Sequence, residues 1–173
     1  MPHNLTKIYD NLLEVGHLSE LMRSQSLRRI FDRDFDGTLA FRRRQIRPIK
    51  KDGEASLDTA FRHLTTREDK DSNGKTLGSR SFETYRSVRL HWIKHHLCES
   101  SPTSIEVFSF EDRVAGRDKI RTYVYDVRNE YVIILEPQRS LMDYYILTAY
   151  YLNEPGGLKQ INNKLKKRLP KIY

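Results

Sequence analysis

Four short runs rich in β-branched and aromatic residues stand out in the second half of the chain. They span residues 105–110, 121–125, 131–135 and 144–151 and are separated by polar connections. The connection of residues 126–130 is short enough for a hairpin between two antiparallel strands. Because runs of this composition fit a pleated, half-buried surface, the sequence predicts an antiparallel sheet of about four strands.

Residues 81–98, which precede these runs, have the period of an amphipathic helix. Side chains recur there at spacings of three and four: Phe82, Tyr85, Val88, Arg89, Trp92, Ile93, His96 and Leu97. Ser81 is able to cap the first turn with its hydroxyl. The pattern predicts one long helix on which the sheet packs.

The remaining segments predict elements at both ends of this core. Apolar residues within 12–30 recur at helical spacings and predict two short helices. Residues 39–49 alternate apolar side chains with arginine, which is typical of a basic edge strand. Residues 66–80 are almost entirely polar and predict a mobile surface loop, and residues 158–169 predict a basic C-terminal helix.

The expected fold class is therefore α+β, with N-terminal helices and a basic C-terminal helix around the sheet and its long helix. The chain has 173 residues, which is the length of one domain. We expect residues 1–31 to form an N-terminal helical arm and residues 32–173 to form the α+β domain.

Basic residues outnumber acidic ones, 31 to 23, which gives a net charge of +8. They are concentrated in two segments: residues 23–51 hold ten basic and three acidic residues, and residues 159–173 hold six basic and no acidic residue. Such an excess favours contact with polyanions through their phosphates. Many basic proteins nevertheless bind no nucleic acid, so charge alone leaves the partner open.

Cys98 is the only cysteine, so the chain forms no internal disulfide and fits a reducing compartment. The first 20 residues lack the continuous apolar centre of a signal peptide. No stretch approaches the roughly 20 apolar residues of a membrane span. We expect a cytoplasmic protein without a membrane partner.

A histidine, two arginines and a threonine have the chemistry needed to cleave a phosphodiester without a metal. Attack by the 2′-hydroxyl of RNA requires a proton carrier, for which His63 is suited. It also requires cations at the phosphate, and Arg86 and Arg89 lie three apart on the predicted helix. Alternation of side chains along the last strand predicts that Thr148 shares one face with Tyr144, Ile146 and Tyr150.

Each of these features has an ordinary explanation as well. A single histidine beside a loop is common, and the two arginines also fit a solvated helix face paired to Glu83 or Glu99. Thr148 is good strand material in its own right. His91 and His95 have the spacing of paired zinc ligands, but position 92 is Trp where a zinc-protease helix carries Glu. We therefore predict no metal and interpret His91, Lys94, His95 and His96 as surface or RNA-facing residues.

The order of the motifs resembles a group of phage and bacterial ribonucleases related to barnase, EndoU, colicin D and RelE. That group has a Phe-x-His-Leu element, an Arg-x-x-Arg-Leu/Ile-x-Trp helix, a β-meander and a Leu-Thr-Ala-Tyr strand. The corresponding residues are 61–64, 86–92, 105–135 and 147–150. The resemblance covers roughly residues 35–168.

The resemblance implies a curved antiparallel sheet and metal-independent RNA cleavage that leaves a 2′,3′-cyclic phosphate. It implies His63, Arg89 and Thr148 as the catalytic set, with Arg86 as a fourth member. Barnase uses a glutamate base with a histidine acid, whereas RelE relies on basic residues. Whether His63 acts as base or acid therefore stays open.

The sequence thus predicts a toxin-type endoribonuclease without a cofactor, acting on cellular RNA such as tRNA or mRNA. The residues expected to contact RNA are Arg42, Arg43, Arg44, His91, Lys94, Tyr150, Lys166 and Lys167. An acidic immunity protein that complements the net charge is the expected protein partner. The alternative is a non-catalytic RNA- or DNA-binding regulator. A transferase-like fold with a nucleotide cofactor ranks last, because no glycine-rich phosphate loop is present.

Overall fold

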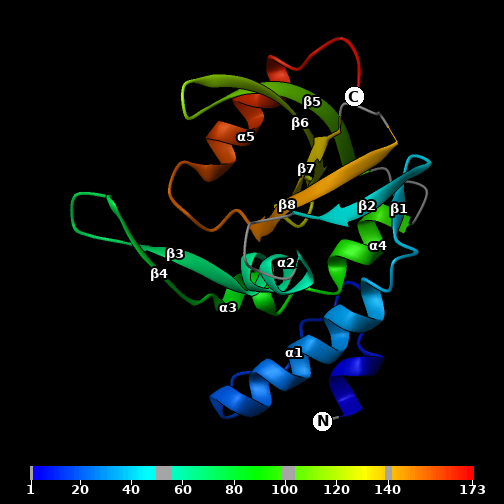
Figure 1. The fold of residues 1–173 in the computed structure, drawn as a ribbon, viewed down its shortest axis with the longest axis vertical. Coiled ribbons are helices and arrows are strands. Elements are labelled where there is room, and N and C mark those ends of the chain that lie inside the picture. Colours follow the sequence, from blue (N-terminus) through cyan, green and yellow to red (C-terminus); the bar gives the residue numbers. More distant parts are fainter. Residues whose placement is uncertain (1, 50–55, 99–103, 139–141) are drawn as a thin grey trace.

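A mixed β-sheet forms the centre of the molecule (Figure 1). The computed structural model describes residues 2–49, 56–98, 104–138 and 142–173, and within them the sheet has six strands in the order β1-β2-β8-β7-β6-β5. These are β1 (Ala40–Phe41), β2 (Arg44–Pro48), β5 (Ile105–Val114), β6 (Arg117–Asp126), β7 (Tyr131–Pro137) and β8 (Asp143–Tyr151). A separate two-stranded sheet consists of β3 (Thr66–Lys70) and β4 (Thr76–Phe82).

Strands β5 to β8 pair in chain order as antiparallel neighbours, so the predicted four-strand meander is confirmed. The whole sheet is mixed rather than antiparallel, because β2 pairs with β8 in parallel. The connection from β2 to β8 runs through the helices and three further strands of the sheet, which leaves enough chain for a parallel crossover. The predicted edge strand is divided: β1 lies at the edge of the sheet, and β2 lies between β1 and β8.

Helices cover both faces of the sheet and bury two apolar clusters. They are the 3-10 helix η1 (Pro2–Thr6) and the helices α1 (Glu20–Asp34), α2 (Ser56–Thr65), α3 (Thr84–Ser87), α4 (Trp92–Cys98) and α5 (Gly157–Lys166). On one face, α1, α2 and α4 contribute to a cluster that includes Leu64, Ile93 and Ile146. On the other face, Ile161 of α5 packs with Phe108. The expected α+β class and the C-terminal helix are confirmed.

The expected single helix over residues 81–98 is wrong. Strand β4 ends inside this range, and α3 has only four residues before a turn leads into α4. The Glu83 carboxylate starts α3, since it accepts two of the first backbone N–H groups of the helix. Residues 90–93 are all buried, a run of four that one face of a helix cannot place inward. The chain therefore turns between α3 and α4.

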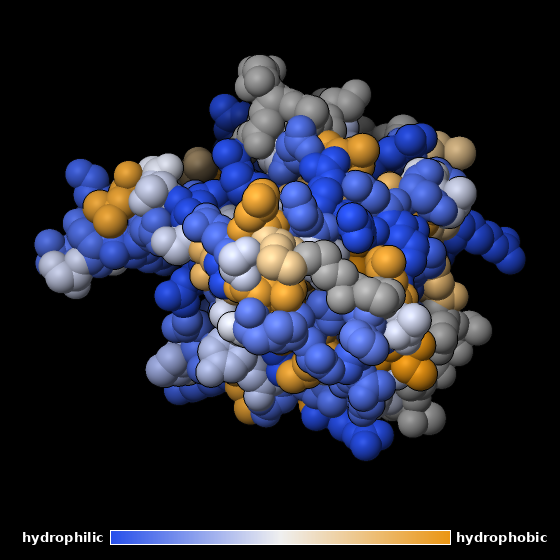
Figure 2. Space-filling model, turned by 90° about the horizontal axis from the view of Figure 1, so that it is seen from below, coloured by the Kyte–Doolittle hydropathy of each residue, from blue (hydrophilic) through white to orange (hydrophobic). Residues whose placement is uncertain are grey.

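Residues 66–80 belong to a β-hairpin, so the expectation of a mobile loop is wrong. The Asp71 carboxylate accepts two backbone N–H groups of the turn, and Gly74 takes the positive φ of 80° that the turn requires. Across the two strands Glu68 lies opposite Arg80, which is a favourable pair. The hairpin projects from the body (Figure 1) as a largely hydrophilic arm (Figure 2), and this explains its lack of apolar alternation.

The N-terminal segment shares the core of the rest of the chain. Leu13 and Val15 are buried in the same cluster as Phe31 of α1 and Ile146 of the sheet. The expectation of two short helices within residues 12–30 is wrong, because α1 is one helix of 15 residues that continues across the boundary expected at residue 31. No helix in the described part of the chain is long and apolar enough to cross a membrane.

Candidate functional site

Two arginine side chains converge where α2 passes into β3. Arg86 of α3 donates from Nη1 to the carbonyl oxygens of His63 at 2.6 Å and Thr66 at 3.0 Å. Arg80 of β4 donates from Nη2 to the same Thr66 carbonyl at 2.9 Å, and from Nε to the Thr66 hydroxyl at 2.8 Å. The two guanidinium groups thus share one neutral acceptor.

This arginine cluster, Arg80 and Arg86, has an excess of positive charge. Among the residues that the structure describes, no carboxylate lies within ion-pair distance of Arg86, and Glu68 approaches Arg80 at 3.7 Å. Burial lowers the pKa of both guanidinium groups, and for Arg86 the charge of Arg80 acts in the same direction. The buried Nε of Arg86 has no hydrogen-bond partner within the described residues. An anion placed here would relieve this imbalance.

A groove of about 630 Å³ adjoins the arginine cluster. Its walls are the hairpin strand β3 on one side and Glu154, in the connection from β8 to α5, on the other. An ion pair between Arg67 of the hairpin and Glu154 bridges the two walls. The groove is lined by Arg67, Glu68, Asp69, Lys70, Arg80, Arg86 and Glu154. It is open, polar and slightly cationic, which suits a segment of nucleic-acid backbone.

A β-bulge in β8 separates residues that were expected on one face. The register of β8 on β7 shifts at Leu147, so the alternation of side chains reverses there. Tyr144 and Ile146 face the cluster of α1, α2 and α4, whereas Tyr150 packs in the cluster of α5. Thr148 pairs with a residue of that second cluster and shares its face. The expected single face for these four residues is wrong.

The bulge places Tyr150 near the arginine cluster. The Arg86 guanidinium carbon lies 6.0 Å from the centre of the Tyr150 ring. Burial raises the pKa of Tyr150, although the positive charge of Arg86 acts in the opposite direction. Thr148 lies two residues earlier on the same face of β8. Beyond Ile146, β8 no longer pairs with β2, and its last residues, Tyr150 and Tyr151, lie against Arg86 and Tyr85 of α3.

Arg89 packs against an aromatic ring of β8. Its guanidinium carbon lies 4.2 Å from the centre of the Tyr151 ring, and its Nη1 donates to the Tyr85 carbonyl at 2.7 Å. Burial lowers the pKa of Arg89. Since Tyr151 and Thr148 lie an odd number of residues apart after the bulge, they point to opposite faces of β8. Arg89 therefore contacts a residue on the face of β8 opposite to that of Thr148, and its catalytic role stays a prediction.

His63 lies in the last turn of α2 and is half-buried. Its carbonyl is one of the two that Arg86 binds, so its backbone belongs to the wall of the arginine cluster. The role of the imidazole stays a prediction. Of the expected catalytic set, the structure brings Arg86 next to the backbone of His63 and near the face that carries Thr148.

The residues expected to contact RNA occupy several surfaces. Arg42 and Arg43 are exposed at the turn between β1 and β2, and Lys166 and Lys167 are exposed at the end of α5. Other members are less free: the Arg44 guanidinium lies 4.9 Å from the centre of the Tyr144 ring, and Lys94 lies 3.9 Å from Asp34.

The surface position expected for His91 and His96 is wrong. His91 exposes 5% of its surface and His96 exposes 4%. Burial lowers the pKa of His91 to about 4, which keeps its imidazole neutral. Both belong to a run of apolar residues that fills the core, so the residue types alone could not reveal their burial. His91 is withdrawn from the RNA-contacting set.

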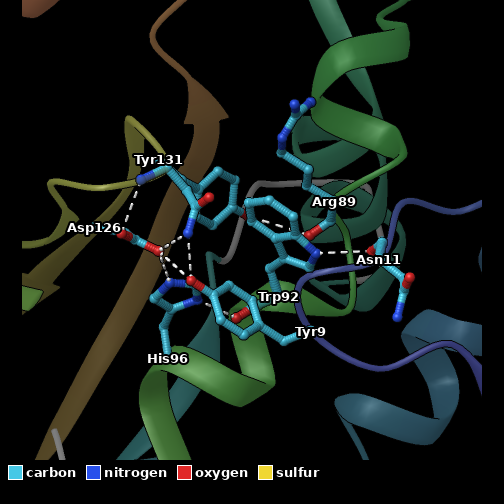
Figure 3. A network of polar contacts seen from close by, with 8 residues as sticks. Tyr9, Asn11, Arg89, Trp92, His96, Asp126 and Tyr131 are labelled. Carbon is cyan, nitrogen blue, oxygen red and sulfur yellow. Dashed lines mark hydrogen bonds and ion pairs between the residues drawn. The ribbon is translucent and has the colours of Figure 1, made fainter. Parts of the chain in front are cut away.

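A second cluster of titratable groups surrounds the Asp126 carboxylate (Figure 3). Asp126 Oδ2 accepts from the Tyr9 hydroxyl at 2.7 Å, and lies 2.9 Å from Nε2 of His96. The Asn129 side chain and backbone N–H also donate to this carboxylate. Figure 3 shows that the Arg89 side chain points away from this Asp126 network. No group of three or more potential metal ligands occurs among the residues described by the structure.

Sequence patterns missed Arg80 and Arg67, because both fall within the segment assigned to a loop. A usable signal was present. Asn73-Gly74 is a strong turn signal for a hairpin, and it stands between two polar runs of similar length. A hairpin there would have placed Arg80 opposite the start of β3 and therefore close to His63.

Comparison with known proteins finds no match: no family model matches the chain, and no curated protein or solved structure is similar to it. The functional conclusion therefore depends on the residues of the chain and their arrangement.

Proposed function

We propose that this chain is a metal-independent endoribonuclease whose scissile phosphate binds at the arginine cluster. The observation that carries the proposal is the sharing of the Thr66 carbonyl by two guanidinium groups. Arg86 has no ion pair with a carboxylate among the described residues, and both cations line an open groove. Arginine keeps its proton and matches the geometry of phosphoryl oxygens.

The proposed reaction needs no metal or cofactor, only the RNA, the protein and solvent water. The 2′-oxygen bonds to phosphorus as the bond from phosphorus to the 5′-oxygen breaks, which leaves a 2′,3′-cyclic phosphate and a 5′-hydroxyl. One proton leaves the 2′-hydroxyl and another reaches the departing oxygen. His63 is the proposed carrier for one of these protons and solvent water exchanges the other, while Arg80 and Arg86 offset the charge that accumulates on the phosphoryl oxygens.

The hydroxyl groups of Thr148 and Tyr150 lie on the face of β8 near Arg86 and are proposed to orient the phosphate. Arg89 is proposed as a positioning residue, because it holds the Tyr85 carbonyl rather than the groove. Arg42, Arg43, Lys166 and Lys167 are proposed to contact the RNA backbone. The proposed setting is a toxin acting on tRNA or mRNA in the cytoplasm, countered by an acidic immunity protein.

The test is cleavage of end-labelled RNA by the purified chain in EDTA. We expect cyclic-phosphate ends from the parent and a loss of about a hundredfold in rate for His63→Ala and for Arg86→Met. Arg113→Gln is the matched control, because Arg113 is an exposed cation on the β5–β6 hairpin and pairs with an exposed Asp118. Cleavage that needs a divalent metal, or that survives both site substitutions, would refute the proposal.

A non-catalytic RNA-binding regulator is the second candidate. It is favoured by the contact of Arg89 with the face of β8 opposite to that of Thr148, since a regulator needs the cationic groove and no assembled catalytic set. For a regulator, the RNA would stay intact in the same assay and its binding would weaken steeply with salt. His63→Ala would then leave the affinity unchanged.

A further inference from the structure

A second groove, of about 340 Å³, adjoins the first. The two grooves share Arg67, Asp69 and Glu154 in their walls. The second groove, called here the Tyr85 pocket, is otherwise lined by Asn153 and by residues 81–85, which span the end of β4 and the start of α3. A ligand whose phosphate lies at the arginine cluster would extend into this pocket.

Tyr85 is an aromatic surface that the protein supports from one side and leaves open on the other. Its side chain is 52% exposed. The Tyr151 ring lies behind it at a centroid distance of 6.2 Å and a tilt of 35°. Arg89 contacts both residues. Its guanidinium carbon lies 4.2 Å from the centre of the Tyr151 ring, and its Nη1 donates to the backbone carbonyl of Tyr85 at 2.7 Å. The ring is therefore held in place beside the groove.

The chemistry of the pocket fits a nucleobase better than an apolar group. A planar base stacks on a tyrosine ring and, unlike an aliphatic chain, brings polar edges. The rim offers matching groups, including the amide of Asn153 and the hydroxyls of Ser81 and Thr84. Double-stranded RNA keeps its bases paired and stacked inside the helix, so it cannot place one on Tyr85.

We propose that the Tyr85 pocket is a nucleobase subsite, and that the groove takes single-stranded RNA with an unpaired base next to the bound phosphate. The assignment of the phosphate to Arg80 and Arg86 depends on the proposed function. The base subsite depends on Tyr85, its support by Tyr151 and the wall residues that the two grooves share.

The experiment measures binding of a short, fluorescently labelled RNA in which every 2′-hydroxyl is methylated, so that cleavage cannot occur. Fluorescence anisotropy gives Kd for the single strand, for the same strand with single abasic positions, and for the duplex. We expect the single strand to bind more tightly than the duplex. Tyr85→Ala should weaken single-strand binding by about 5- to 150-fold, the range that corresponds to one stacked base, whereas Tyr85→Phe should bind as the parent does.

The abasic strands identify the contact. In the parent, one abasic position should weaken binding, and in Tyr85→Ala the same position should have no further effect, because the two changes remove one interaction. Tyr145→Ala is the matched control, since Tyr145 lines a different groove at the other end of β8. Its single-strand affinity should stay within about twofold of the parent, a difference of about 0.4 kcal/mol.

Unchanged single-strand affinity in a folded Tyr85→Ala protein would overturn the subsite, and so would equal affinity for the duplex. Additive losses from the abasic position and Tyr85→Ala would overturn it as well. Failure of the proposed function has a different signature. A parent that binds the methylated strand through Tyr85 yet leaves ordinary RNA intact would keep the base subsite and reject the nuclease.

Discussion

The Asp126 network and the arginine cluster are both partly or fully buried and charged, but they differ in how their charges are matched. His96 and Asp126 expose 1% and 0% of their side chains, and the carboxylate receives hydrogen bonds from Tyr9, His96 and Asn129. The other ring nitrogen of His96 lies 2.6 Å from the Trp92 carbonyl. Arg80 and Arg86 instead share the Thr66 carbonyl and repel each other. Among the described residues, Glu68 approaches only Arg80, at 3.7 Å.

The difference is the basis for proposing a structural role for the Asp126 network and a ligand-binding role for the arginine cluster. A buried charge with a full set of partners rigidifies the fold around it. Buried cations without a counter-charge cost free energy, and such sites occur where a ligand supplies the missing partner. The Asp126 network joins the N-terminal segment, α4 and the sheet, whereas the arginine cluster opens on a groove. We therefore expect substitutions in the Asp126 network to lower the free energy of unfolding, and substitutions in the arginine cluster to lower the rate of RNA cleavage.

The largest effect is expected for Asp126→Ala. Removing the carboxylate leaves the buried donors of Tyr9, His96 and Asn129 without their acceptor, and each unsatisfied group costs about 1–3 kcal/mol in the free energy of unfolding. Urea denaturation followed by circular dichroism measures this loss. Tyr9→Phe, which removes one hydrogen bond to the same carboxylate, should cost about 1 kcal/mol. Equal and small losses in the free energy of unfolding for both variants would contradict a structural role for the Asp126 network.

Arg86→Met should have the opposite signature. The rate of RNA cleavage should fall by about a hundredfold, or about 2.7 kcal/mol, because a cation at the phosphate is lost. The free energy of unfolding should change by less than about 1 kcal/mol, since the lost hydrogen bonds are offset by removal of a desolvated charge without a carboxylate partner. Destabilisation by several kcal/mol with normal cleavage would assign Arg86 to the fold.

Acid should weaken the fold through Asp126. Burial would raise the pKa of this carboxyl, but hydrogen bonds from His96, Tyr9 and Asn129 outweigh burial and hold the pKa well below its usual range. The unfolded chain binds this proton more readily, at a pKa of about 3.9. The stabilisation is therefore present above about pH 4 and lost as the pH falls further. Urea unfolding between pH 7 and pH 3 measures the decline, which should be shallower in Asp126→Asn.

The parts of the fold that were predictable are those whose signal lies within each segment. Strands β5 to β8 carry their own β-branched and aromatic runs, so the meander followed from the sequence. The structure of residues 81–98 did not follow from the sequence. Their apolar period of three and four is interrupted by four consecutive buried positions, residues 90–93, and that burial depends on the tertiary core. The β3–β4 hairpin has no apolar face, so its polar residues resembled a loop.

The candidate site was predictable in the same uneven way. Arg86 was identified from its residue type and its position after a histidine element. The strand face that carries Thr148 was not predictable, because one extra residue at Leu147 reverses the alternation of side chains along β8. Arg80 was hidden in the hairpin, and its position beside Thr66 depends on strand register, which is a long-range property. Residue types thus suggested candidate side chains, whereas their arrangement in space needed the structure.

The smallest expected effect concerns the turn between β1 and β2, where two arginines hold an unfavourable backbone conformation. Its two residues, Arg42 and Arg43, have positive φ values of 49° and 66°, which Asn-Gly adopts far more readily. The corresponding turn between β5 and β6 is Ala115-Gly116, with φ values of 48° and 78°. Replacing Arg42-Arg43 by Asn-Gly should raise the free energy of unfolding by about 1 kcal/mol.

The same substitution should weaken RNA binding if the arginines contact the backbone. Loss of two phosphate contacts to a single strand should reduce the slope of log Kd against log salt concentration by about 1.4. The double variant Arg113→Gln, Arg117→Gln removes the same charge from the β5–β6 hairpin and should leave the slope closer to that of the parent. Equal slopes for the two double variants would mean that the strained turn holds its arginines for a reason other than RNA.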